Sequence, residues 1–187
     1  MRNKIDPRKL KWIYQPKLFV QDEDKLVLET EPFTDLRPAG KGAEAIELSI
    51  LPQGSFCFSA RVDFDFKNTF DQCGLMLYLG ENRKAIIGTE YKDPEIMKLS
   101  CIVYHNKIGD RSIRDLSANI HSMDYRIWYR GGALRIQYSF SGGRYSDLRE
   151  FWIDPGKGKL SIGMYACSPA NSWFDCTFSN MYLEEED

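Results

Sequence analysis

The chain has 187 residues, 43% of them hydrophobic and 13% aromatic. This is enough to bury a core as one domain, since domains commonly run to about 100–200 residues. Its 25 basic and 27 acidic residues are mixed along the chain, without the basic block that neutralises phosphates in nucleic-acid-binding proteins. No run approaches the roughly 18 apolar residues of a membrane span, and the first residues carry no apolar signal region. We therefore expect a single cytoplasmic domain that binds neither nucleic acid nor membrane.

Five cysteines are odd in number, widely spaced and mostly set in apolar strand patterns. They are Cys57, Cys73, Cys101, Cys167 and Cys176. This arrangement is unlike a disulfide framework or a zinc ribbon, so we interpret them as buried, reduced thiols. The two histidines, His105 and His121, lie far apart and have no HxH or HxxxH spacing. The sequence therefore predicts no metal site and no cofactor.

Apolar and polar residues alternate along most of the chain, which is the pattern of β-strands. In chain order, the predicted strands lie at 12–15, 18–20, 25–30, 45–51, 56–66, two runs within 70–91, and 99–105, 125–130, 134–140, 151–153, 160–166 and 174–183. No segment longer than about ten residues keeps a helical period. Ten or more strands separated by turn signals predict either a closed barrel or a two-sheet sandwich, and we favour the sandwich.

Glycine and proline mark the connections between these strands. Pro32, Pro38, Gly40 and Gly42 indicate an early loop, and further turn signals are Gly142-Gly143, Gly156 and Gly158. The pair Gly131-Gly132 separates RIWYR from ALRIQYSF. Two residues that readily adopt positive φ fit the tight turns that match strand twist, so this pair predicts a β-hairpin.

The stretch from 70 to 91, FDQCGLMLYLGENRKAIIGTEY, predicts a second hairpin with a polar turn. In its second run Ala85, Ile87 and Thr89 alternate with Ile86, Gly88 and Glu90. One face can therefore enter a core while the other displays polar and aromatic groups, which is how a sheet presents a sugar- or peptide-binding surface.

Several segments, in this order, resemble a bacterial and fungal domain family of uncharacterised function that includes proteins named for regulation of enolase. The segments are Trp12 with Pro16, Thr34-Asp35, FDQCGLMLY at 70–78, Gly88 with Glu90, SCIVY at 100–104, Trp128 with Arg130, YSFSGGRY at 138–145 and IGMYACSP at 162–169. The resemblance implies an all-β fold, a two-sheet antiparallel jelly-roll sandwich of the concanavalin A-like type. In that fold a concave sheet commonly holds carbohydrate, and related domains accompany glycoside hydrolases.

The chain departs from the family pattern at three tryptophans. Those expected after Thr34-Asp35, before Gly88 and after Asp110 are replaced by Leu36 or Arg37, by Lys84 and by Arg111. Sugars often rest on an aromatic ring, because its large apolar area and quadrupole favour that contact. The remaining candidates for this contact are Trp128, Tyr78, Tyr91, Tyr104 and Trp173.

Glu90 is the carboxylate of greatest interest, because it lies within a strand among apolar or small neighbours. A carboxylate in that position must be hydrogen-bonded, ion-paired or open to a cleft. It either accepts hydrogen bonds from sugar hydroxyls, or acts as a general acid or base, or pairs structurally with Arg126 or Arg130 on a neighbouring strand.

The other candidate residues also have two interpretations. Asp71 and Gln72 either line the mouth of a cleft or fix the entrance of their strand through turn hydrogen bonds. If Trp128 and Arg130 share the face of Glu90, they form a ligand clamp, with the ring stacking and the guanidinium binding oxygens. The alternative is a structural ladder in which an arginine covers Trp128.

These residues predict a protein that binds a carbohydrate or a small polar ligand on its concave sheet. Its site would consist of Glu90, Trp128, Arg130, Tyr78, Asp71 and Gln72. A second hypothesis is a protein-interaction module that regulates a metabolic enzyme. A third is a sugar-processing enzyme that uses Glu90, which the sequence disfavours because the Glu-x-Asp-x-x-Glu pattern of glycosidases with this fold is absent.

Overall fold

The computed structural model describes residues 2–37, 42–50, 54–79, 83–106, 108–140, 142–153 and 160–186. The predicted turn at 80–82 and the turn signals Pro38, Gly40, Gly156 and Gly158 lie outside this part of the chain. The described residues form fifteen strands and one short 3-10 helix, at Pro7–Lys9. The strands are β1 (Arg2–Lys4), β2 (Lys11–Tyr14), β3 (Phe19–Gln21), β4 (Lys25–Glu29), β5 (Glu44–Ile50), β6 (Ser55–Phe64), β7 (Gln72–Leu79), β8 (Arg83–Tyr91), β9 (Ile96–His105), β10 (Ile108–Ser117), β11 (Ser122–Arg130), β12 (Ala133–Ser139), β13 (Ser146–Trp152), β14 (Leu160–Cys167) and β15 (Asp175–Glu186).

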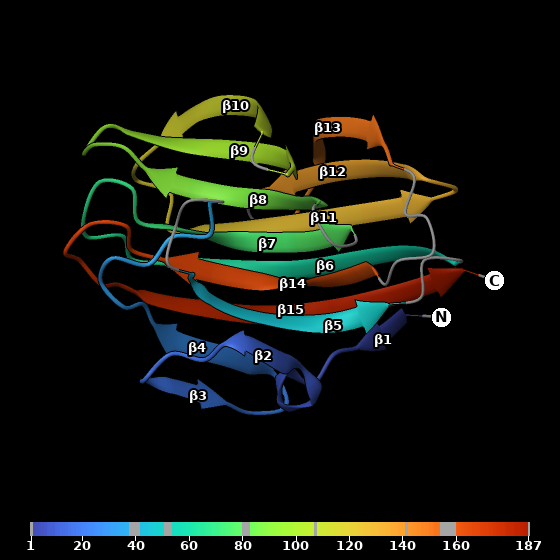
Figure 1. The fold of residues 1–187 in the computed structure, drawn as a ribbon, viewed down its shortest axis with the longest axis horizontal. Helices are drawn as coiled ribbons and strands as arrows, with labels where there is room; N and C mark the ends of the chain where they lie inside the picture. The colour runs from blue at the N-terminus through green and yellow to red at the C-terminus, as the bar shows by residue number, and fades with distance from the viewer. Residues whose placement is uncertain are drawn as a thin grey trace.

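The strands form two antiparallel sheets (Figure 1). Sheet A has the order β13-β12-β11-β6-β15-β4-β3, with β1 also paired to β15, and sheet B has the order β10-β9-β8-β7-β14-β5-β2. Figure 1 shows the strands of both sheets running along roughly the same axis, with the N- and C-termini at the same end of the sandwich. The predicted two-sheet antiparallel jelly-roll sandwich is confirmed. No helix in the described part of the chain is long and apolar enough to cross a membrane.

The main core lies between the sheets, because alternate residues of each strand point inward. In β6 the inward set includes Phe58 and Val62, and in β7 it includes Leu75 and Leu77, all almost fully buried. Each such side chain contributes about 1.5–3 kcal/mol through burial. All five cysteines are free and buried, which confirms their interpretation as thiols.

The hairpin predicted at Gly131-Gly132 is confirmed. It joins β11 to β12, whose ladder ends at the pair Arg130 and Ala133. Gly131 and Gly132 have φ of 54° and 85°, a conformation in which a side chain would be strained. The turn therefore depends on glycine at both positions.

The sequence interpretation missed β10 and β1 and found only the end of β13. Nearly all residues of β10 are exposed, as are all three residues of β1. Because β10 lies at the edge of sheet B and β1 pairs only with β15, neither strand shows hydrophobic alternation. Backbone pairing with β9 and β15 places them in the sheets.

A second, smaller hydrophobic cluster lies on the outer face of sheet B. Leu36 and Ala43 precede β5 and pack there against Met76, Ile86 and Tyr165 from three strands. The segment between β4 and β5 therefore covers part of this face, and it leaves a recess beside it.

Glycines allow the fully buried Tyr165 ring to lie close to the sheet. A Cβ atom on Gly88 would come within 2.2 Å of the carbonyl oxygen of Cys73 and 2.9 Å of Tyr165 Oη. Gly74, the register partner of Gly88, is equally crowded, with 2.1 Å to the carbonyl oxygen of Ile87. Side chains at these two positions are therefore excluded by contact with backbone.

Candidate functional site

A small pocket opens on the outer face of sheet B beside the covering segment. Its volume is about 170 Å³, and its lining residues are Tyr14, Asp35, Leu36, Arg37, Gly42, Tyr78 and Lys84. Tyr78 and Lys84 are opposite each other in the register of β7 and β8. The pocket therefore has a wall on the rigid sheet and a wall on the segment that precedes β5.

The polar groups of this pocket are held by specific contacts. Lys84 donates through Nζ to the carbonyl oxygen of Leu36 and lies 5.6 Å from the centre of the Tyr104 ring. Burial lowers the pKa of Lys84. Asp35 accepts from Arg37 Nε at 2.7 Å, and this hydrogen bond raises the pKa of Arg37. Lys84 and the ion pair of Asp35 and Arg37 thus line the same pocket as Tyr14 and Tyr78.

Glu90 lies on the same outer face and forms an ion pair. Its Oε1 atom is 3.4 Å from Nη2 of Arg111 on β10, and the same Nη2 atom is 3.5 Å from Ser100 Oγ on β9. The structural pairing expected with Arg126 or Arg130 is therefore wrong. The charge of Glu90 also contributes to the raised pKa of Arg37, so the carboxylate lies within electrostatic range of the pocket.

Of the two residues proposed for the cleft mouth, Asp71 is fully buried. Its Oδ2 atom accepts from the backbone N–H groups of Lys67 and Asn68 at 2.9 and 2.8 Å and from Ser172 Oγ at 3.2 Å. Asp71 therefore organises the turn before β7 rather than a cleft. Gln72 is 7% exposed and lies opposite Glu90 in the register of β7 and β8.

Trp128 and Arg130 do not share the face of Glu90. They belong to β11 in sheet A, where they alternate with the inward-facing Ile127 and Tyr129. The clamp with Glu90 is therefore wrong, because the whole core separates the two sets. Trp128 instead donates through Nε1 to Gln137 Oε1 at 3.0 Å, across the hairpin.

Sequence reasoning did not assign Arg37, Lys84 or Arg111 to a site. The only signal was that these positions carry basic residues where the family resemblance predicted tryptophans. That they gather on one face became visible only in the structure, since Arg111 comes from the edge strand β10, which was missed.

Glu44, at the start of β5, is a further unanticipated carboxyl group. It is 4% exposed and accepts from the backbone N–H of Glu31 at 3.2 Å, with Thr34 Oγ1 3.4 Å from its Oε2 atom. Burial raises its pKa to about 7. The pKa of this group therefore lies near neutral pH, and its side chain contacts Glu31 and Thr34 in the segment between β4 and β5.

No group of three or more His, Cys, Asp or Glu side chains within the described ranges is arranged to hold a metal ion. The site is made of tyrosines, paired charges and one half-buried lysine, Lys84. Together with the fold, it defines the molecule as a two-sheet β-sandwich with a small polar recess on an outer sheet face.

The chain belongs to the family described as a protein of unknown function, DUF1349, whose model matches residues 12–186. It is 27% identical over 176 residues to "Regulation of enolase protein 1" of Saccharomyces cerevisiae, covering 92% of this chain and 87% of that protein. Both findings confirm the resemblance drawn from the sequence.

Solved structures share the fold. A functionally unknown protein from Saccharomyces cerevisiae superposes with a TM-score of 0.82 at 24% identity, covering 97% of this chain and 99% of that one. The GH43 BlXynB protein from Bacillus licheniformis superposes with a TM-score of 0.74 at 12% identity, covering 98% of this chain but 38% of that one. The CBM2 module of an evolved Dit protein from Lactobacillus casei BL23 phage J-1 superposes with a TM-score of 0.61 at 11% identity. The match covers 90% of this chain and 79% of that one.

Proposed function

We propose that the protein binds a carbohydrate or a related small polar ligand on the outer face of sheet B. The observation that carries the proposal is the placement of the Tyr14, Tyr78 and Lys84 recess near the ion pair of Glu90 and Arg111. Hydrogen-bond donors, acceptors and aromatic walls thereby lie together on a rigid sheet, which is the composition of sites that recognise polyhydroxylated molecules.

Each residue has a role in this proposal. Glu90 accepts hydrogen bonds from ligand hydroxyls, because its contact with Arg111 is long at 3.4 Å and leaves its second oxygen available to a ligand. Arg111 and Lys84 donate to ligand oxygens. Tyr78 provides an apolar wall and a hydroxyl. The charges in this region are largely paired, which suits a neutral ligand.

The structural neighbours share the fold of this chain. One is a GH43 protein and another is a CBM2 module, and both have sandwiches of this fold. At their low identities the likeness extends to the fold, so the ligand class rests on the residues of sheet B.

A thermal-shift titration with neutral mono- and oligosaccharides tests the proposal. A ligand that binds only the native state stabilises it by about 2.7 kcal/mol at one hundred times its Kd, and so raises Tm. We expect a sugar-dependent rise that is lost in Glu90→Gln and Tyr78→Ala. The matched control is Trp152→Ala, which removes an aromatic ring that is 71% exposed on sheet A. Equal shifts in all variants would exclude this face.

A second candidate function is regulation of a metabolic enzyme through direct binding. It is favoured by the relative named "Regulation of enolase protein 1", which aligns with 92% of this chain. Size-exclusion chromatography of the purified protein with purified enolase tests it. A stoichiometric complex that persists in Glu90→Gln would support the regulatory function over the sugar site, and separate elution at micromolar concentrations of both proteins would count against it.

A further inference from the structure

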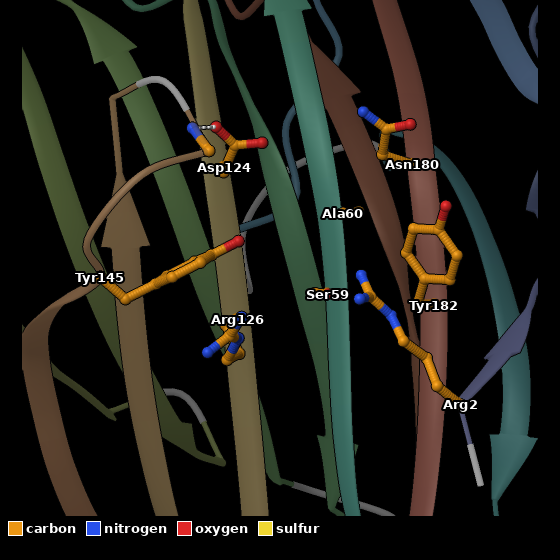
Figure 2. A pocket seen from close by; sticks show the side chains of 9 residues that line it. Arg2, Ser59, Ala60, Asp124, Arg126, Tyr145, Asn180 and Tyr182 are labelled. Carbon is orange, nitrogen blue, oxygen red and sulfur yellow. Dashed lines mark hydrogen bonds between the residues drawn. The ribbon is translucent and has the colours of Figure 1, made fainter.

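A larger polar pocket lies on the opposite side of the molecule, on the outer face of sheet A (Figure 2). Its volume is about 380 Å³, and its lining residues are Arg2, Ser59, Ala60, Asp124, Arg126, Gly142, Tyr145, Asn180 and Tyr182. Pockets for small molecules usually measure roughly 300–1,000 Å³. The space is therefore sufficient for a compact metabolite.

Irregularities in two segments create this pocket. The pairing of β15 with β6 shifts between Ser179 and Tyr182, and Asn180 there has a positive φ of 50°. The connection from β12 to β13 returns over the sheet, where Gly142 donates its N–H to Asp124 Oδ2 at 2.6 Å. The small Ser59 lies between these two walls, so the sheet surface is hollowed at that point.

Arg126 is the cation of this pocket that has no ion-pair partner within the described part of the chain. Its Nε atom is buried and has no hydrogen-bond partner among the described residues, none of which forms an ion pair with it. Its guanidinium carbon lies 3.8 Å from the centre of the Tyr145 ring and 5.9 Å from that of Trp128. Aromatic contacts hold the side chain in place without neutralising it. A buried unsatisfied donor is costly, and a bound acceptor would remove that cost.

The carboxylate of the pocket is already compensated. Asp124 accepts from Gly142 and lies 3.5 Å from Nη1 of Arg61. It is therefore not available to neutralise Arg126, although both residues belong to β11.

A second guanidinium faces Arg126 across the pocket. Arg2 lies with its guanidinium carbon 4.0 Å from the centre of the Tyr182 ring, and its Nε atom is 3.4 Å from Glu184 Oε1. Figure 2 shows Arg2 and Arg126 on opposite sides of Ser59. Two arginines that frame a small hydroxyl-bearing floor are suited to an oxyanion, since the guanidinium fork matches carboxylate and phosphate geometry.

We propose that this pocket binds the carboxylate or phosphate group of a small hydroxylated molecule between Arg126 and Arg2. Ser59 and the hydroxyl groups of Tyr145 and Tyr182 bind the hydroxylated part of the ligand. The pocket is independent of the recess on sheet B, because the core of the sandwich separates the two faces.

Isothermal titration calorimetry at constant ionic strength tests the proposal with glucuronate, glucose 6-phosphate, inorganic phosphate and neutral glucose. We expect one of the anionic probes to bind and to lose at least tenfold in affinity in Arg126→Gln. The control Arg130→Gln removes the same charge from the exposed end of the same strand, and its affinity should match the unchanged protein. Binding of glucuronate alone identifies a carboxylate ligand, whereas binding of glucose 6-phosphate or inorganic phosphate identifies a phosphate ligand.

Ser59→Gln provides a second variant that keeps every charge and fills the floor of the pocket. It should abolish binding of the anion while thermal unfolding stays cooperative, even if Arg126→Gln folds poorly. Glu90→Gln should leave anion binding unchanged, which separates this site from the one on sheet B. The proposal is overturned if none of the three anions binds, or if Ser59→Gln and Arg126→Gln bind as tightly as the unchanged protein.

Discussion

Glu90 and Arg111 form an ion pair across two strand spacings of sheet B, with 3.4 Å between Oε1 and Nη2. The residue directly beside Glu90 in the register of β8 and β9 is Lys98, but Lys98 pairs with Asp115 on β10 instead. The cation that reaches Glu90 therefore comes from the edge strand. This arrangement leaves Glu90 beside the partly exposed Arg111 and near the recess of Tyr14, Tyr78 and Lys84.

Replacing Arg111 with Gln should weaken sugar binding more than it weakens the fold. The pair is partly exposed, so its loss should cost less than about 1 kcal/mol of unfolding free energy. Loss of a ligand contact should lower affinity about tenfold, the equivalent of ~1.4 kcal/mol. Urea unfolding and sugar titration measure the two effects. Lys98→Gln, which removes a cation paired to Asp115, should leave affinity unchanged.

Replacing Glu44 with Gln should stabilise the protein increasingly as the pH rises above 4.5. Burial raises the pKa of folded Glu44 from 4.5 to about 7, so the folded state binds a proton that the unfolded chain releases. The free-energy penalty for the buried negative charge of Glu44 is absent below pH 4.5. It grows as the pH rises towards 7 and is complete above pH 7.

The Tm difference between Glu44→Gln and the unchanged protein should therefore be largest at about pH 8 and shrink to nothing near pH 4.5. The shift from 4.5 to about 7 sets an upper limit of about 3 kcal/mol. Glu95→Gln, at an exposed position, serves as the charge-matched control. A Tm difference independent of pH would show that the pKa of Glu44 is the same in the folded and unfolded states.

Substitution of Gly88 by Ala should destabilise the protein strongly. The new methyl group would lie 2.2 Å from the carbonyl oxygen of Cys73, where the backbone of β7 must shift, and 2.9 Å from Tyr165 Oη. Overpacking of this kind costs about 1–3 kcal/mol or more. Chemical denaturation compares it with Gly54→Ala, whose Cβ atom would meet nothing nearer than 4.0 Å. Similar midpoints for the two variants would contradict the close approach of β7 and β8.

Substitution of Asp71 by Ala should destabilise the turn before β7. It leaves the N–H groups of Lys67 and Asn68 without an acceptor and removes the contact with Ser172. Leaving these buried N–H groups without an acceptor should cost on the order of 1–3 kcal/mol. Asp63→Ala, at a side chain that is 42% exposed, is the matched control and should change stability little. If sugar affinity fell while stability held, Asp71 would belong to a site after all.

Much of the fold was predictable because its signals are local. Inward and outward side chains alternate with a period of two, so Val62 or Leu77 reveals its burial through its neighbours alone. The turn at Gly131-Gly132 is equally local, since positive φ at both residues depends on the lack of a side chain. Exposed strands such as β10 carry no such pattern and were missed for that reason.

The candidate sites depended on long-range arrangement. Alternation shows that Glu90 and Trp128 both point away from a core, but it does not show which sheet each strand joins. Lys84 meets the carbonyl group of Leu36 across 48 positions of the chain, and Arg126 meets Tyr145 only because the connection after β12 folds back. The sequence by itself therefore determined the strands that have a buried face, and the glycine turn. Only the tertiary structure decided which polar residues share a surface, because strand partners and sheet membership follow from packing between distant segments.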